Sequence, residues 1–566
     1  MKNYALYNSV EYKNMRELVT SCARRFDDKT AYSYRINPKD KEKIKISYRQ
    51  VGNDVRALAT EFISRGYTGK HVAVSGKTSY SWICTYYALI CAGAVMVPLD
   101  PDWAGEELAH TVSFAECEYL ICDREMSEKA EAILAEAPIK EHILINGKTS
   151  DGKERLKDLI FHGQTKFEEG DNSFAEQELD TEALALIVFT SGTTGKGKGV
   201  MLTQKMILSD IADGFKYVQA TERSISVLPL HHTFGSTVNL LGNLCAGAEL
   251  YLSSGVRYIL RELKTEKPTH LILVPLYLET FYRKISANIK EKGKEKIVEN
   301  TMKVSNSLRK LGIDRRKDLF KEILEVFGGE LKLVISGGAP LNQELINTFD
   351  AWGVTILNGY GITECAPLIS VNRNKKQIKG SVGYVLPCDE VKIADPDDAG
   401  EGEIRVKGPN VMLGYYRDAQ STVEVFDEEG FFRTGDYGKL DENGALYITG
   451  RLKNLIILSN GKNVYPEEIE SVFSAVHGVQ DAVVYEGQSK RGAEHNAIVL
   501  EIFPDAEYCK ANKIENIRVY MQKYLDDYNR NAVPYKKVGV LKVRTEDFPK
   551  NTMRKIQRFK IDKTID

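Results

Sequence analysis

The sequence of 566 residues lacks the patterns of a metal-binding or disulfide-bonded protein. Its nine cysteines are scattered without a C-x-x-C pair, and its nine histidines show no H-E-x-x-H spacing. A long chain with an odd number of scattered cysteines and no visible secretion signal is typical of free thiols in a reducing compartment. We therefore expect neither a disulfide framework nor a zinc site, and we expect a cytoplasmic location.

The sequence also lacks an excess of charge and a convincing membrane span. Its 77 Lys and Arg residues against 79 Asp and Glu leave a formal charge of −2, which does not favour nucleic acid as a partner. The run from Thr78 to Leu99 contains no charged residue, but it includes Gly93 and Pro98. A buried helix over about 80–91, a turn and a strand VMVPL explain this run better than a transmembrane helix does. Peripheral contact with a membrane stays open.

The remaining pattern predicts an α/β fold with more than one domain. Hydrophobic residues make up 43% of the chain and charged residues 28%, as in globular proteins, and the length exceeds that of one ordinary core. Short apolar runs alternate with helical patterns, which favours parallel sheets in two α/β subdomains. Short strands and Gly/Asp turns at about 381–450 predict a small β subdomain. We thus expect a large N-terminal domain over 1–452 and a small α+β domain over 453–566.

Two helical segments carry more specific expectations. PEEIESVFSAV places Ile469, Val472, Phe473 and Val476 on one helical face, behind an acidic first turn. Residues 283–326 are dense in Lys, Arg and Glu with helical spacing. A solvated helical excursion is the favoured interpretation of that segment. A surface that approaches a membrane or a partner is the alternative.

The stretch FTSGTTGKGKG at 189–199 has the chemistry of a phosphate-binding loop. It follows the apolar run LALIVFT, so it leaves the end of a strand, where open α/β sheets bind ligands. Its glycines allow backbone N–H groups to approach an anion, and it supplies hydroxyl groups and two lysines. It nearly fits a P-loop, but Gly199 replaces the Ser or Thr that binds Mg²⁺, and no helix is expected there. A glycine-rich turn without a ligand is the other interpretation of this loop taken alone.

Further motifs follow the loop in a fixed order. They are VISGGAP at 334–340, YGITE at 360–364, RTGD at 433–436, GRLKN at 450–454 and PKNTMRKIQR at 549–558. Together with the loop, this set resembles the adenylate-forming superfamily of acyl-CoA synthetases, luciferases and adenylation domains of peptide synthetases. The resemblance extends over nearly the whole chain. Gly197, in place of the usual Pro, and Arg554, in place of the usual Gly, depart from it.

The resemblance implies an ATP-dependent ligase that needs Mg²⁺. Such enzymes join a carboxylate to ATP to give an acyl-adenylate and pyrophosphate, and then transfer the acyl group to a thiol such as that of CoA. Thr363 matches the position that contacts the α-phosphate, and Glu364 matches the Mg²⁺ ligand, a hard oxygen donor. The loop residues implied in binding the β- and γ-phosphates are Thr190, Ser191, Gly192, Thr193, Thr194, Gly195 and Lys198.

The resemblance also assigns the rest of the nucleotide site. Asp436 matches the carboxylate that binds the ribose hydroxyls, although a turn residue is the plainer interpretation, and Arg451 matches a second nucleotide contact. Lys555 matches the lysine that acts in adenylation, and Lys453 the hinge about which the C-terminal domain rotates to bring up the Gly461 region. For Lys453 an ordinary linker lysine has comparable weight. The implied walls of the adenine slot are Gly337, Gly338, Ala339, Tyr360 and Gly361.

The expected substrate is a medium- to long-chain fatty acid. His232, beside His231, matches the family segment that lines the acyl pocket, where we expect it to act as a wall or gate. Acetate-type members close the pocket with a Trp where this chain has Gly361, so a pocket beyond acetate is implied. LSNGKNVYPEEIE is similar to the corresponding segment of bacterial long-chain fatty acid–CoA ligases. The alternatives are a separate acyl-carrier protein as acceptor, an aryl acid as substrate, a P-loop ATPase or kinase, and a silent adenylate-binding module.

Overall fold

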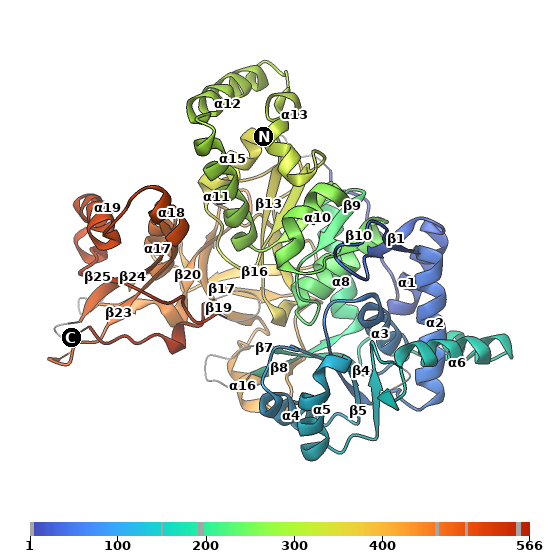
Figure 1. Cartoon of the computed structure of the whole chain (residues 1–566). Coiled ribbons are helices and arrows are strands. Elements are labelled where there is room, and N and C mark those ends of the chain that lie inside the picture. Colours follow the sequence, from blue (N-terminus) through green and yellow to red (C-terminus); the bar gives the residue numbers. More distant parts are fainter. Residues whose placement is uncertain are drawn as a thin grey trace. The chain divides into compact units, whose positions relative to one another are not determined.

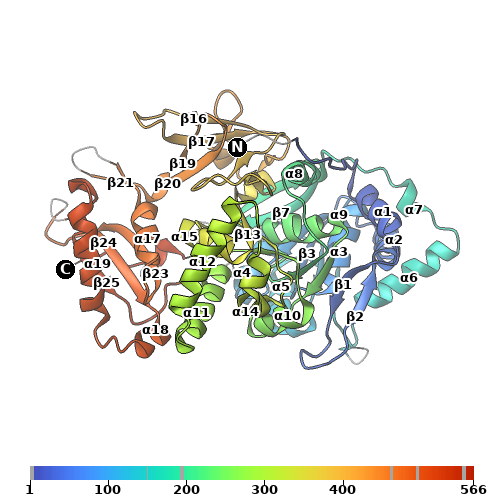
Figure 2. The same ribbon diagram turned by 90° about the horizontal axis from the view of Figure 1, so that it is seen from above.

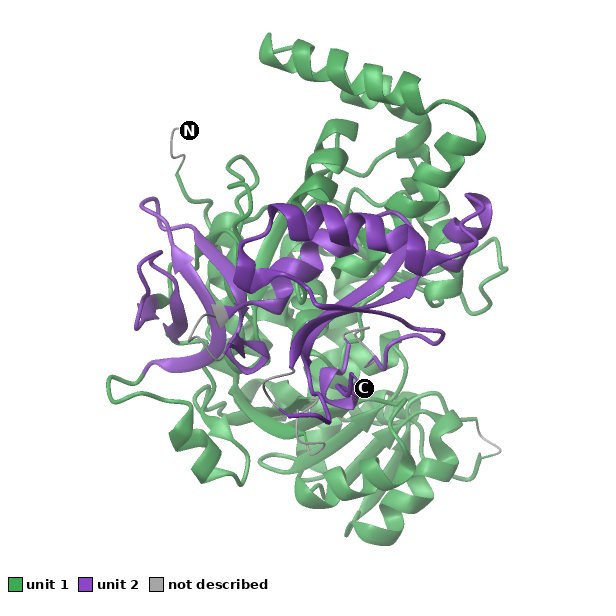
Figure 3. Cartoon of the chain, turned by 90° about the vertical axis from the view of Figure 1, so that its left-hand side faces the viewer, with its two compact units in different colours: residues 1–390, 407–430 green, residues 391–406, 431–566 purple. Residues whose placement is uncertain are grey.

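The computed structural model describes residues 5–148, 151–190, 197–458, 463–492, 496–550 and 556–565. The chain forms two compact units (Figure 3). Unit 1 comprises residues 1–390 and 407–430, and unit 2 comprises residues 391–406 and 431–566. The chain therefore crosses between the units more than once, although the sequence pattern predicted a single boundary.

The first large sheet of unit 1 confirms the predicted α/β architecture. Its strand order is β18-β8-β7-β4-β3-β5-β6. The five strands from β7 to β6 run parallel, whereas β8 and β18 are antiparallel to their neighbours. The strands are β3 (His71–Ser75), β4 (Val95–Leu99), β5 (Tyr119–Cys122), β6 (Glu141–Leu144), β7 (Leu184–Thr190), β8 (Lys198–Thr203) and β18 (Gly414–Tyr415).

The long uncharged run forms a buried helix and a strand, as predicted. Helix α3 (Tyr80–Cys91) begins at the N-cap Ser79, whose hydroxyl accepts a hydrogen bond from the Trp82 N–H. Gly93, at φ +72°, turns the chain into β4. Among the described residues, no helix combines the length and the apolar character that crossing a membrane requires.

Two further sheets complete the second α/β subdomain of unit 1. The sheet β2-β1-β10-β9 consists of β1 (Thr30–Tyr34), β2 (Ile44–Ser47), β9 (Arg223–Ser226) and β10 (Glu249–Leu252). The sheet β11-β12-β13-β14-β15 consists of β11 (His270–Leu273), β12 (Leu333–Ser336), β13 (Thr355–Gly361), β14 (Leu368–Val371) and β15 (Tyr384–Val385). Strands β11, β12 and β13 are parallel, so their carboxyl ends meet at one edge. That edge carries two of the predicted motifs.

The charged segment after β11 forms the predicted helical excursion. It consists of α11 (Pro275–Glu291), α12 (Glu295–Lys310), α13 (Arg316–Leu319) and α14 (Lys321–Leu324), and the chain then returns to β12 (Figures 1 and 2). Phe281 and Ile285 of α11 are buried in the same apolar core as Phe327 and Leu345. The base of the excursion is thus anchored in unit 1, while α12 lies farther out.

Unit 2 contains the β subdomain and the C-terminal segment. One sheet has the order β16-β17-β19-β20, with β16 (Glu390–Ala394), β17 (Gly402–Lys407), β19 (Phe432–Leu440) and β20 (Leu446–Arg451). A second sheet is formed by β23 (Val479–Gly487), β24 (Ala497–Pro504) and β25 (Val540–Val543), next to α17 (Pro466–Ser474) and α19 (Ile517–Asn531).

Packing joins these two parts of unit 2, whereas the sequence pattern grouped the β subdomain with the N-terminal domain. The ring of Tyr437 on β19 stacks on Tyr465, with centroids 5.1 Å apart. A Cβ on Gly450 would lie 2.8 Å from the Tyr465 ring, so β20 approaches this aromatic side chain closely. The rotation of the C-terminal domain about Lys453 stays a prediction.

The burial of α17 differs in part from the amphipathic pattern. Ile469 and Phe473 are buried and Val476 packs against the same core. Val472, on the edge of that helical face, is 47% exposed. The buried residues Ile469 and Phe473 are one helical turn apart, and Val472 lies to the side of that line.

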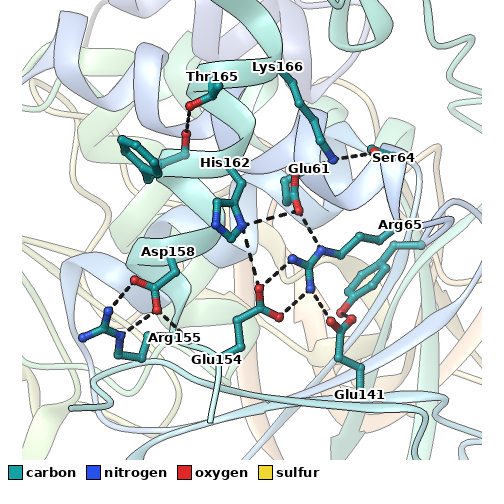
Figure 4. Close-up of polar contacts among 12 residues, drawn as sticks. Glu61, Ser64, Arg65, Glu141, Glu154, Arg155, Asp158, His162, Thr165 and Lys166 are labelled. Atoms are coloured by element: carbon teal, nitrogen blue, oxygen red, sulfur yellow. Dashed lines mark hydrogen bonds and ion pairs between the residues drawn. The ribbon is translucent and has the colours of Figure 1, made fainter. Parts of the chain in front are cut away.

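An ionic network stabilises the packing of helix α6 (Leu156–Glu168) on α2 (Tyr48–Ser64) (Figure 4). Arg65 binds Glu154 through both terminal nitrogens, at 2.6 and 2.7 Å, and binds Glu61 through Nε at 2.8 Å. It also contacts Glu141 on β6. The Glu61 side chain is only 3% exposed, so the ion pair with Arg65 offsets the cost of burying this carboxylate. The Arg65 guanidinium also lowers the pKa of Glu154.

Replacing Arg65 by Met should lower the free energy of unfolding by about 3 kcal/mol at pH 7, because three carboxylates would lose their shared cation. A carboxylate with a lowered pKa in the folded state stabilises that state above its unfolded pKa, and this contribution disappears as the pH falls through the folded value. The deficit should therefore shrink below about pH 4. Thermal denaturation of both proteins across pH measures it.

Arg49→Met is the matched control, since Arg49 lies in the first turn of α2, whose C-cap is Arg65, and pairs with the exposed Asp27. We expect a clearly smaller loss for this variant. Equal losses in the two variants would contradict the role assigned to Arg65.

Candidate functional site

The predicted phosphate loop connects two antiparallel strands. Strand β7 ends at Thr190 and β8 begins at Lys198, directly opposite in the ladder. The Thr190 hydroxyl donates to the Lys198 carbonyl oxygen at 3.4 Å. Because the chain continues from Lys198 as a strand, it lacks the helix that starts after a P-loop. The structure thus agrees with the rejection of a P-loop.

Gly197 has a structural reason. A Cβ at this position would lie 2.6 Å from the Thr190 carbonyl oxygen. A proline, the usual residue in the family pattern, carries that Cβ and would require the backbone to shift. The departure at Gly197 therefore accompanies a close approach of the two ends of the loop.

The second motif, YGITE, turns the chain sharply after β13. Thr363 and Glu364 lie in a short 3-10 turn, η6 (Thr363–Cys365), and both are half-buried. The Ile362 N–H donates to the Pro367 carbonyl oxygen at 2.8 Å, which closes the turn. A Cβ on Gly361 would lie only 2.0 Å from that same oxygen. Gly361 is thus required by the backbone itself, a reason that differs from the missing Trp inferred from the sequence.

Tyr415 connects the two motifs, and the sequence analysis missed it. Its hydroxyl donates to Glu364 Oε1 at 2.9 Å, and Lys198 Nζ lies 4.6 Å from the centroid of its ring. Burial raises the pKa of the Tyr415 hydroxyl, with the Glu364 carboxylate adding to the shift. The Tyr415 hydroxyl therefore remains protonated and donates its hydrogen bond. Glu364 and Lys198, from motifs far apart in the sequence, thus both contact this one side chain.

Strand pairing fixes Tyr415 in this position. Strand β18 adds to β8, with Tyr415 opposite Val200, and the Tyr416 N–H donates to the Gly199 carbonyl oxygen at 2.7 Å. The Met412 N–H donates to the Glu364 carbonyl oxygen at 2.8 Å. The segment GPNVMLGYY at 408–416 thus binds both motifs. Its only sequence signal is a pair of tyrosines after a glycine, which does not reveal partners as distant in the chain as Glu364 and Lys198.

A buried polar clamp holds the chain that follows Glu364. Asp210 on α8 (Gln204–Tyr217) accepts a hydrogen bond from the Leu368 N–H at 2.9 Å. Asn410 donates to the Leu368 carbonyl oxygen at 3.0 Å and to Asp389 at 3.1 Å. Burial raises the pKa of Asp389 to about 7 and that of Asp210 well above its ordinary value. The backbone N–H and the carbonyl oxygen of Leu368, at the start of β14, are therefore both held by buried polar side chains.

The residues predicted to form the adenine slot lie at the carboxyl ends of adjacent parallel strands. Gly337 and Gly338 follow β12, and Gly338 has φ +84°, which favours glycine. A Cβ on Gly337 would lie 3.5 Å from the Gly359 carbonyl oxygen on β13. Tyr360 is buried and Ala339 is exposed. This edge of the sheet is where α/β folds bind ligands.

His231 and His232 are half-buried next to each other before the π-helical segment η3 (Phe234–Leu241). Their ring centroids are 4.4 Å apart. Burial lowers the pKa of His231 to about 4 and that of His232 to about 3. Both rings are therefore neutral near pH 7. Neutral rings suit the wall of an apolar pocket better than positively charged ones would.

An apolar cavity of about 60 Å³ lies between α8, the η3 segment and the strands β11, β12 and β14. Its wall continues from the His232 segment through Val238, and from the adenine-slot turn through Ile335. Leu368, held by the polar clamp, also lines it. Its other apolar side chains include Ile211, Phe215, Val218, Ile272 and Val371.

Unit 2 contains the remaining described candidates. Asp436 on β19 is 2% exposed and binds Arg451 on β20, with Oδ1 and Nε 2.7 Å apart. The two predicted nucleotide contacts thus pair with each other across the strands. Lys453 lies in η7 (Leu452–Asn454) and lines a cavity of about 110 Å³ together with Arg558 and Lys563.

Several predicted residues lie outside the described part of the chain. They are Ser191, Gly192, Thr193, Thr194, Gly195, Gly461 and Lys555. Within the described residues, no cluster of three or more His, Cys, Asp or Glu side chains could hold a metal ion. Glu364 offers one hard oxygen donor, so Mg²⁺ at this carboxylate would need phosphate oxygens and water as its other ligands, which is its usual preference.

Comparisons with known proteins identify the family to which the chain belongs. The sequence pattern of the family described as AMP-binding enzyme matches residues 19–416. Long-chain-fatty-acid–CoA ligase 5 of Mus musculus is 30% identical over 502 residues, which cover 83% of this chain and 72% of that protein. The long-chain-fatty-acid–[acyl-carrier-protein] ligase AEE15 of Arabidopsis thaliana is 28% identical over 567 residues, covering 86% and 76%.

A solved structure has the same fold over nearly the full length. The crystal structure of ATP-bound MatB from Rhodopseudomonas palustris matches with a TM-score of 0.74 at 26% identity, covering 96% of this chain and 97% of that chain. The matched family region includes the loop after β7, the YGITE turn and Tyr415. The chain therefore belongs to the family of AMP-binding enzymes, in agreement with the resemblance seen in its sequence.

Proposed function

We propose that this protein activates a carboxylic acid with ATP and transfers the acyl group to CoA. In the first step a carboxylate oxygen attacks the α-phosphorus of ATP, and pyrophosphate leaves. In the second step the thiolate of CoA attacks the acyl carbon, and AMP leaves with the bridging oxygen. The observation that supports this most directly is the convergence of Lys198 and Glu364 on Tyr415 in an AMP-binding enzyme.

Each candidate residue has a task in that reaction. The loop from Thr190 to Lys198 would bind the β- and γ-phosphates, and Thr363 would contact the α-phosphate. Tyr360 and the Gly337 turn would hold the adenine, and Asp436 the ribose. Lys555 would stabilise the charge that develops when the carboxylate attacks. Mg²⁺ bound by Glu364 would neutralise charge on the phosphates.

The proposed acid is a medium- to long-chain fatty acid. The cavity beside the His232 segment supports an aliphatic acid, because most of its lining side chains are hydrophobic, with Asp210, Asn243 and His270 as the polar ones. The names of the mouse and Arabidopsis relatives also point to long-chain fatty acids. CoA is the preferred acceptor, and the name of the Arabidopsis relative keeps a carrier protein as the second candidate.

Acid-dependent exchange of labelled pyrophosphate into ATP tests the first step. We expect exchange that requires a carboxylic acid and increases from acetate to acids of medium and long chain. An aryl acid series is the comparison, and adding CoA should produce a thioester and AMP. No exchange with any acid would refute the proposed activity. Exchange without thioester formation would make a carrier protein the acceptor.

Lys555→Ala should abolish most adenylation, because the cation at the attacked phosphate would be lost. Removing such a group typically costs about 100-fold or more in rate. The neighbouring Arg554→Ala is the matched control and should change the exchange rate little. The reverse pattern would assign the role to Arg554.

Tyr415→Phe should raise the Mg²⁺ concentration needed for half-maximal exchange about tenfold, because Glu364 would lose a charge-assisted hydrogen bond. The phenyl ring would remain beneath Lys198, so the melting temperature should change little. Tyr416→Phe is the matched control, since its hydroxyl binds Glu116 at 2.6 Å in an exposed position. Identical Mg²⁺ dependence in both variants and the unmodified protein would exclude a positioning role for Tyr415.

A further inference from the structure

Helix α12 carries a row of aliphatic side chains that face solvent. Ile297, Val304 and Leu311 follow one another at intervals of seven residues and are 62%, 54% and 76% exposed. Leu311 is the first residue after the helix. A spacing of seven residues places side chains on nearly the same helical face. The row extends for about 21 Å, at 1.5 Å per residue.

The opposite face of α12 attaches the helix to unit 1. Val298 and Met302 pack against the apolar core, and Ser305 is buried. Arg309 binds Asp350 on α15 (Gln343–Trp352) at 2.7 Å. Figure 1 shows α12 at the outer end of the excursion, beyond α11. The inner face thus attaches α12 to unit 1, while the aliphatic row faces solvent.

A row of lysines runs beside the aliphatic row. Lys296, Lys303 and Lys310 each precede one of the three aliphatic residues, and all three are exposed. Residues 290–322 contain eleven Lys and Arg against six Asp and Glu, a net charge of +5 in a chain whose total is −2. The pair between Lys303 and Glu299 is exposed on both sides, so it screens little of this charge.

We propose that Ile297, Val304 and Leu311, with Lys296, Lys303 and Lys310, form a docking surface for an anionic lipid bilayer. An interfacial helix buries an apolar stripe at the level of the headgroups while flanking lysines bind anionic headgroups. The stripe here is narrow, and it is bordered by positive charge as that geometry requires. The surface goes beyond the proposed reaction, because it would exist whatever acid the enzyme activates. For a fatty acid dissolved in the bilayer, it would bring the enzyme to its substrate.

Flotation of the full chain with lipid vesicles, without ATP or acid, tests the surface. One set of vesicles contains phosphatidylcholine alone, and the other contains about 30% phosphatidylglycerol. We expect binding to the anionic vesicles that weakens at high salt, because the lysine contribution is screened. Two triple variants remove one component each: Ile297→Ser, Val304→Ser and Leu311→Ser in the first, and Lys296→Gln, Lys303→Gln and Lys310→Gln in the second.

Each triple variant should lower the vesicle partition coefficient at least about tenfold. The matched control carries Val256→Ser, Val423→Ser and Val519→Ser, which remove exposed aliphatic side chains elsewhere, and it should bind as the unmodified protein does. All variants should keep the unmodified melting temperature and the same pyrophosphate exchange with a short water-soluble acid. If the unmodified protein shows no pyrophosphate exchange, the proposed reaction is refuted, but the vesicle result still tests the docking surface.

Three results would overturn the proposal. They are equal binding to neutral vesicles, binding that neither triple variant reduces, and a control variant that loses as much as the stripe variants do. Light scattering without lipid adds a fourth. If the unmodified protein self-associates and the aliphatic triple variant becomes monomeric, the row contacts a second copy of the chain and not a bilayer.

Discussion

The pairing of β18 with β8 is the constraint on which the candidate site depends. It adds the residues Gly414 and Tyr415 to the edge of the seven-stranded sheet, next to the strand that leaves the phosphate loop. The Tyr415 side chain thereby lies within reach of Lys198 and Glu364, which belong to motifs more than 160 residues apart in sequence. Without this pairing, Tyr415 would not lie between Lys198 and Glu364. The geometry of the site is thus determined by backbone hydrogen bonds before any ligand binds.

Several hydrogen bonds from other segments hold the turn at Glu364 and the residues that follow it. Met412 binds the Glu364 carbonyl oxygen, and Asp210 and Asn410 bind the two backbone polar groups of Leu368. Buried hydrogen bonds of this kind are costly to break, because each lost partner leaves a desolvated polar group. Leu368 also lines the apolar cavity, so the clamp connects the wall of that cavity with the turn that carries Thr363 and Glu364. A rigid turn of this type suits a site that must hold a carboxylate and a phosphate in fixed positions.

Local patterns in the sequence were sufficient for the elements and the motifs, but not for their contacts. The strand LALIVFT, the buried helix after Ser79 and the strand after Lys198 follow from apolar periodicity, capping and the absence of a helix signal. Gly361 and Gly197 have reasons that only the folded backbone reveals, because each faces a carbonyl oxygen that the closed turn or loop brings back to it, that of Pro367 and that of Thr190. Tyr415, Asp210 and Asn410 were missed for the same reason. Val472 shows another limit, since helical periodicity groups it with Ile469 and Phe473, whereas packing buries those two and leaves Val472 exposed.

The account rests on the claim that a carboxylate oxygen becomes bonded to the α-phosphorus of ATP. Mass spectrometry of AMP formed from a fatty acid labelled with oxygen-18 in its carboxyl group, in the presence of CoA, tests this claim most directly. The thiol cleaves the bond between the acyl carbon and the bridging oxygen, so the account predicts one labelled oxygen in each AMP. Unlabelled AMP, or ADP and phosphate as the products, would contradict it.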